Sequence, residues 1–162
     1  MNVNQDLLQR QDALRQSITV GWICALQLVV IMFVVALLRA AIGNDFTGFS
    51  KDPGDLGMRV MLVVFTIYAV IPIALRMIGG VVFRWAMVGV AVFFLLMFVA
   101  HQLSHMYMDG RPLNFFHTLD FAHHGMMLWL IVLTVRWARL AQRDVASASA
   151  RPGVGGLAVG AK

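Results

Sequence analysis

Charged residues are scarce in this chain of 162 residues, whereas apolar residues are abundant. Only 13% of the residues are charged, 60% are hydrophobic, and the mean hydropathy is +0.78. A water-soluble domain needs a larger polar share to cover its surface, so this composition predicts an integral membrane protein. The formal net charge of +5 then bears on membrane orientation and on contact with anionic lipids, and it implies no nucleic-acid partner.

Cysteine and catalytic motifs are also lacking. Cys24 is the single cysteine, so the chain can form no intramolecular disulfide and no metal site built from several thiolates. No nucleotide-binding or catalytic motif occurs, and the stretches outside the apolar segments are short. Small size and little extramembrane mass are typical of a non-catalytic accessory subunit of a larger membrane assembly, respiratory or similar. This interpretation stays open, as do partner membrane subunits and a homo-oligomer.

Four apolar segments are present, and each approaches or exceeds the roughly 20 residues that a membrane-spanning helix needs. They cover about 18–38, 58–78, 81–107 and 115–137. Gly79 and Gly80 separate the second segment from the third and favour a tight turn, and Arg84 is expected to reach toward the membrane interface. We therefore predict an all-α integral membrane protein in which residues 18–139 form an up-down bundle of four transmembrane helices.

The two ends of the chain have different patterns. Residues 1–17 are amphipathic and are predicted to extend the first helix along the membrane surface. Residues 140–162 are predicted to form a flexible tail, because the C-terminal SASARPGVGGLAVGAK is rich in glycine, serine and alanine.

Lysine and arginine are distributed unevenly between the two sides of the predicted bundle. Four lie in the first and third connections: Arg39, Lys51, Arg59 and Arg111. The other nine lie near the termini and the second turn: Arg10, Arg15, Arg76, Arg84, Arg136, Arg139, Arg143, Arg151 and Lys162. By the positive-inside rule both termini are cytoplasmic. The expected location is a bacterial inner membrane, which the chain crosses several times.

All five histidines fall between His101 and His124, in HQLSHMYMDGRPLNFFHTLDFAHH. Pro112 and the potential N-cap Asn114 place a turn near residue 112, so this stretch forms the outer end of the third and fourth helices. His101 and His105 share one face of the third helix at i and i+4. Three side chains share one face of the fourth helix at i, i+3 and i+7: His117, Asp120 and His124.

If these two faces meet, four imidazoles and one carboxylate converge. Imidazole is a common ligand of zinc, copper and iron, and a carboxylate can complete or orient such a set. The predicted metal ligands are His101, His105, His117, Asp120 and His124. His123 points about 100° away from His124 and is expected to be a bystander. The competing interpretation is a polar collar of histidines at the lipid headgroups.

HQLSH has the pattern HxxxH, and DFAHH is similar to HxxHH with aspartate in the first place. These two patterns resemble the histidine boxes of membrane di-iron desaturases and hydroxylases, and the resemblance implies O2-dependent oxidation of a lipid chain. The likeness covers about a dozen residues. Those families carry a third box and more histidines, on the cytoplasmic side, so we do not adopt this function.

Three classes of function follow from the sequence. The first is a transition-metal-binding protein for uptake, delivery or sensing, and the second is the accessory subunit. The third is a small oxidoreductase that uses metal, haem or quinone. Haem is less favoured, because two adjacent helices at about 8–10 Å leave little room for a porphyrin between their histidines.

Overall fold

The computed structural model describes residues 3–43, 56–107 and 115–149, and these residues form helices and one short turn without any strand. The four helices are α1 (Val3–Gly43), α2 (Leu56–Met77), α3 (Val81–Tyr107) and α4 (Phe115–Ser149). The predicted all-helical architecture with four helices is confirmed. The predicted turn at residue 112, the N-cap Asn114 and residues 150–162 lie outside the described residues.

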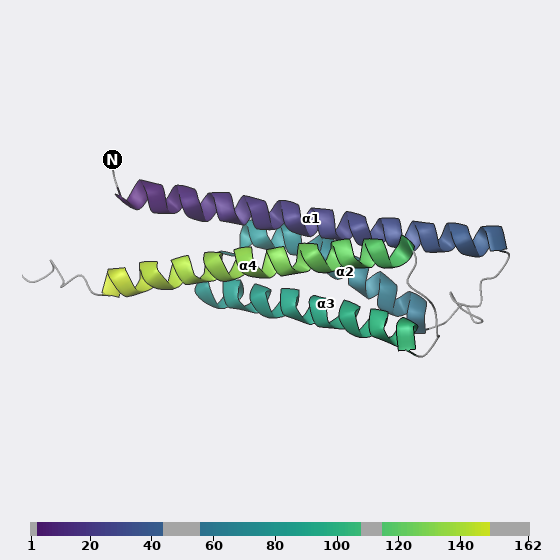
Figure 1. Cartoon of the computed structure of the whole chain (residues 1–162). Coiled ribbons are helices and arrows are strands. Elements are labelled where there is room, and N and C mark those ends of the chain that lie inside the picture. The colour runs from purple at the N-terminus through teal and green to yellow at the C-terminus, as the bar shows by residue number, and fades with distance from the viewer. Residues whose placement is uncertain (1–2, 44–55, 108–114, 150–162) are drawn as a thin grey trace, which may run out of the picture.

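The helices alternate in direction, so the start of α1, the α2–α3 turn and the end of α4 lie at one end of the bundle (Figure 1). We call this the turn end. The opposite end, which holds the last residues of α3 and the first residues of α4, is called the histidine end. Backbones pack closely between α1 and α2, between α1 and α4, and between α3 and α4.

The core is formed by side chains that recur every three or four residues along each helix, the spacing of a buried helical stripe. Large side chains at its centre are Trp22 of α1, Tyr68 of α2, Phe94 of α3 and Trp137 of α4, each almost completely buried. The α1–α4 contact is especially close at Gly21, where a Cβ atom would lie 2.6 Å from Cδ2 of Leu130.

Apolar side chains also cover the outside of the bundle. Large exposed hydrophobic residues occur on all four helices, for example Leu38, Leu62, Phe93 and Leu128. Within the described residues, α1, α2 and α3 are each long and apolar enough to cross a membrane. An outer surface of this kind is stable against lipid chains rather than water, and the prediction of a membrane protein is confirmed at this level.

Helix boundaries differ from those expected at both ends of the chain. Residues 3–17 continue the axis of α1 without a bend (Figure 1), so they do not turn to follow a surface at right angles to the bundle. With 41 residues, α1 reaches about 60 Å at 1.5 Å per residue.

Residues 140–149, expected to begin a flexible tail, belong to α4. No proline occurs between the start of α4 at Phe115 and Pro152, and alanine-rich sequence favours a continued helix.

The expectation that Arg84 reaches outward to the interface is wrong, because its side chain is only 9% exposed and points into the turn end. Its guanidinium donates hydrogen bonds to the carbonyl of Gly79 (2.9 Å), the carbonyl of Trp137 (3.0 Å) and Oε1 of Gln11 (2.9 Å). It also lies 4.4 Å from the centre of the Trp137 ring, within cation–π range. The guanidinium has five N–H donors in one plane, so it can form hydrogen bonds with three chain segments at once. A side chain extended toward the interface could not form these three bonds.

Candidate functional site: the histidine end

The predicted ligands occupy different environments at the histidine end. His101 of α3 is exposed, whereas Asp120 and His124 of α4 are partly buried. The side chains of His105 and His117 lie outside the described residues. Among the described side chains, no three from histidine, cysteine, aspartate and glutamate are grouped so that they could hold a metal ion. The joint five-residue site therefore stays a prediction.

His123, the histidine that we expected to be a bystander, is completely buried in the bundle. It belongs to the buried stripe of α4, which continues through Met127, Leu130, Thr134 and Trp137. This spacing of four, three, four and three residues was visible in the sequence as a heptad pattern. His123 was not predicted as a site residue, because it lies off the polar face shared by His117, Asp120 and His124.

Aromatic side chains from two other helices contact the imidazole of His123. Its ring centre lies 4.2 Å from that of Phe98 on α3 and 6.1 Å from that of Tyr68 on α2. Tyr68 in turn packs edge-on against Trp22 of α1 and Phe94 of α3, with ring centres 5.3 Å and 4.6 Å apart. Close packing of rigid rings fixes the orientation of the imidazole plane.

One hydrogen bond fixes His123 further. The Tyr68 hydroxyl lies 3.0 Å from Nε2 of His123 and 3.7 Å from the sulfur of Met127. The hydroxyl has a single proton. When it donates this proton to the Met127 sulfur, its oxygen is available to accept the Nε2–H of His123. Both contacts are then satisfied, and Nδ1 of His123 carries the free lone pair.

Three buried polar atoms have no hydrogen-bond partner within the described part of the chain. They are Nε1 of Trp22, Nδ1 of His123 and Nε2 of His124. Buried polar atoms in native proteins are nearly always paired, so each such exception points to an interaction with something else. Two of the three atoms are imidazole nitrogens on adjacent residues at the histidine end, and their ring centres are 6.3 Å apart.

Gln102 adds a further polar side chain to the interior of this end. It is 8% exposed and lies one helical turn beyond Phe98, on the same face of α3. The interior at the histidine end is thus lined by Tyr68, Gln102 and His123, although the surrounding helices are apolar. Neither Gln102 nor Tyr68 was singled out in the sequence, because isolated polar residues inside apolar segments have no distinctive spacing.

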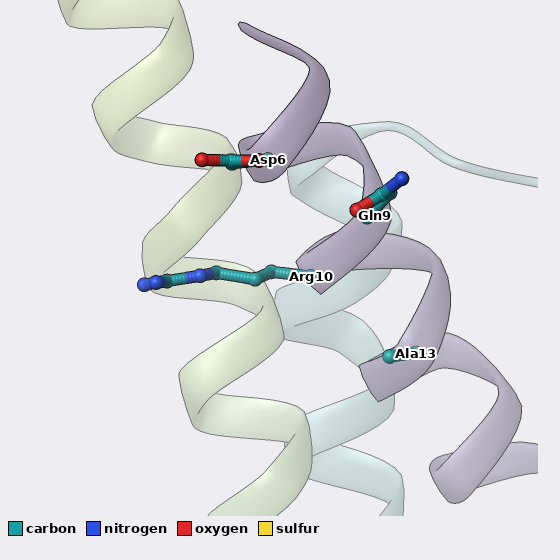
Figure 2. A pocket seen from close by; sticks show the side chains of 4 residues that line it. All are labelled: Asp6, Gln9, Arg10 and Ala13. Carbon is teal, nitrogen blue, oxygen red and sulfur yellow. The ribbon is translucent and has the colours of Figure 1, made fainter. Parts of the chain in front are cut away.

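A shallow hollow at the turn end offers less for binding. It has a volume of about 410 Å³ and is lined by Asp6, Gln9, Arg10 and Ala13 of α1. Figure 2 shows Asp6 and Arg10 extending in the same direction, while Gln9 points away from them. Three of these residues are exposed and none is buried, so the hollow has no desolvated polar group that would select a ligand.

In comparisons with known proteins, no family model, curated protein or solved structure matches this chain.

Proposed function

We propose that this chain is a four-span membrane protein that binds a transition metal at its histidine end, for uptake, delivery or sensing. The ligands proposed are His101, His105, His117, Asp120 and His124, and the candidate metals are zinc, copper and iron. Support for a fourth span comes from α4, which packs against both α1 and α3 and carries exposed apolar side chains such as Leu128 and Val132. The basic bias of the sequence supports cytoplasmic termini in a bacterial inner membrane.

One observation carries the metal proposal. Nε2 of His124, one of the five proposed ligands, is buried and has no hydrogen-bond partner in the described part of the chain. Leaving such a nitrogen unpaired costs about 1–3 kcal/mol per atom. A bound metal would recover this energy, because the lone pair of a neutral imidazole is a strong ligand for zinc, copper and iron.

The composition of the histidine end suits a divalent cation. Four proposed imidazoles are neutral when they bind, and the carboxylate of Asp120 supplies one negative charge to offset the charge of the metal. Asp120 can ligate directly or can accept a hydrogen bond from a ligating imidazole and hold its ring in place. Because the proposed site lies at one end of the bundle, it is accessible from the membrane surface. Uptake, delivery or sensing of a metal requires such access.

Metal titration of the whole protein tests this proposal. Detergent-solubilised protein is stripped with chelator and then titrated with Zn²⁺, Cu²⁺ or Fe²⁺ in an isothermal calorimeter. Stoichiometric binding of at least one metal is expected. Thr66→Ala is a suitable control, because Thr66 is exposed on α2 and its hydroxyl bonds only its own helix at the Leu62 carbonyl. Absence of binding by the reloaded wild type would contradict the proposal and favour an accessory subunit.

A further inference from the structure

We infer that His123 is itself a metal ligand, through Nδ1, and that the Tyr68 hydroxyl on α2 orients it. This inference rests on the proposed function and extends it, because it moves the metal from the polar faces of α3 and α4 toward the interior of the bundle. It also makes α2, which contains no histidine, part of the binding site.

Nδ1 is the ring nitrogen of His123 that is available to a metal. Nε2 of His123 is occupied by the Tyr68 hydroxyl at 3.0 Å. Nδ1 is buried and has no hydrogen-bond partner in the described part of the chain. Metal-ligating histidines almost always bind through one ring nitrogen while the other donates a hydrogen bond that holds the ring. His123 has this arrangement in the tautomer that carries its proton on Nε2, with Tyr68 as the group that holds it.

The ring proton of His123 must reside on Nε2 for Nδ1 to bind a metal. The 3.7 Å contact from the Tyr68 hydroxyl to the Met127 sulfur gives the hydroxyl proton an acceptor of its own. The tyrosine oxygen can then accept from Nε2–H, and the chain of donors runs from His123 through Tyr68 to Met127. This order of donors leaves the lone pair of Nδ1 free.

The separation of the two rings can also be compared with that of two imidazoles on one ion. With metal–nitrogen bonds of about 2.1 Å, the ring centres lie about 5.3 Å apart at a tetrahedral angle and about 6.5 Å apart when the two nitrogens lie opposite each other. The rings of His123 and His124 are 6.3 Å apart, close to the second arrangement. Nε2 of His124 is the other buried imidazole nitrogen without a partner in the described residues. The two adjacent histidines can therefore contribute one nitrogen each to a shared ion.

Conservative substitutions test the inference. Tyr68→Phe removes only the hydroxyl, and we expect it to weaken metal affinity about 10–100-fold, the usual loss when the group that orients a ligand is removed. The visible absorption bands of Co²⁺ loaded into the site should also shift, since the imidazole is no longer held. His123→Leu removes the ligand and should reduce affinity further. Thr66→Ala is the matched control, because it also removes a hydroxyl from α2, but one that bonds only the Leu62 carbonyl of its own helix.

The outcomes separate the two proposals. If wild type binds no metal, the proposed function fails and this inference fails with it. If wild type binds metal while Tyr68→Phe and His123→Leu bind it equally well with unchanged Co²⁺ spectra, the metal proposal stands and the role of His123 is refuted. If His123→Leu does not fold, the Tyr68→Phe affinity and spectrum decide the question alone.

Discussion

The hydroxyl of Tyr68 on α2 and Nε2 of His123 on α4 lie 3.0 Å apart in the interior of the bundle, although 55 positions separate the two residues in the chain. Both side chains are completely buried. A polar pair of this kind is stable among apolar side chains only when its groups are hydrogen-bonded. The pair therefore fixes how α2 and α4 face each other and determines which imidazole nitrogen remains available.

Metal affinity should fall as the pH is lowered from about 7.5 to 5.5, because protons compete with the metal for the neutral imidazoles. Metal affinity falls at lower pH because protons bind to the metal-free site but not to the metal-bound site. Calorimetric titrations at several pH values in buffers that do not bind metal measure this effect. Affinity that is independent of pH across this interval would mean that no solvent-accessible histidine is among the ligands.

Joint substitution of His101→Ala and His105→Ala should abolish most zinc or copper binding if the α3 face contributes to the site. Removing two ligands from a small set costs far more than removing one peripheral group. Titration of the double variant beside Thr66→Ala provides the comparison. Binding equal to wild type would assign these two histidines to the headgroup region and confine the site to α4.

Arg84→Gln should destabilise the protein by about 3 kcal/mol, because buried hydrogen bonds to a charged group each contribute about 1.5–3 kcal/mol and are not additive. The substitution removes the links to the Gly79 and Trp137 carbonyls and the stacking on Trp137. Thermal unfolding in detergent measures the loss. Arg136→Gln is the control, because Arg136 is an exposed arginine, and it should change stability by less than about 0.5 kcal/mol.

Gly21→Leu should destabilise the α1–α4 contact by about 2 kcal/mol or more through overpacking. A Cβ at this position would lie 2.6 Å from Leu130 Cδ2 and 2.8 Å from Trp129 Cζ3, whereas nothing lies within 4 Å of a Cβ at Gly89. Gly89→Leu on α3 is thus the matched control, and both variants gain the same helix propensity. Equal unfolding temperatures for the two variants would show that α1 and α4 do not approach closely at Gly21.

Reporter fusions should locate the two ends of the bundle. The nine-to-four distribution of lysine and arginine predicts that a C-terminal fusion is active only as a cytoplasmic marker, and that a fusion between Asp45 and Asp55 reports the outside. The reverse pattern would place the histidine end in the cytoplasm. Neither outcome alters the packing of the helices, because orientation depends on the flanking charges rather than on the core.

The sequence by itself determined the class of the protein and its helices. Long apolar segments without charge can satisfy their backbone groups in lipid only as helices, and Gly79 and Gly80 marked the turn between α2 and α3. The local spacing of His117, Asp120 and His124 also follows from helix geometry alone. These features depend on interactions within one segment, so a linear pattern is enough to reveal them.

Only the tertiary structure decided which polar residues face inward. Arg84 became a buried link because three separate segments present acceptors to it, and His123 became a core residue because Tyr68, Phe98 and Met127 surround it. A side chain on a membrane helix can face lipid, a neighbouring helix or the headgroups. The sequence of its own helix does not show which of these environments it faces, because that depends on which residues of other helices lie at the same depth.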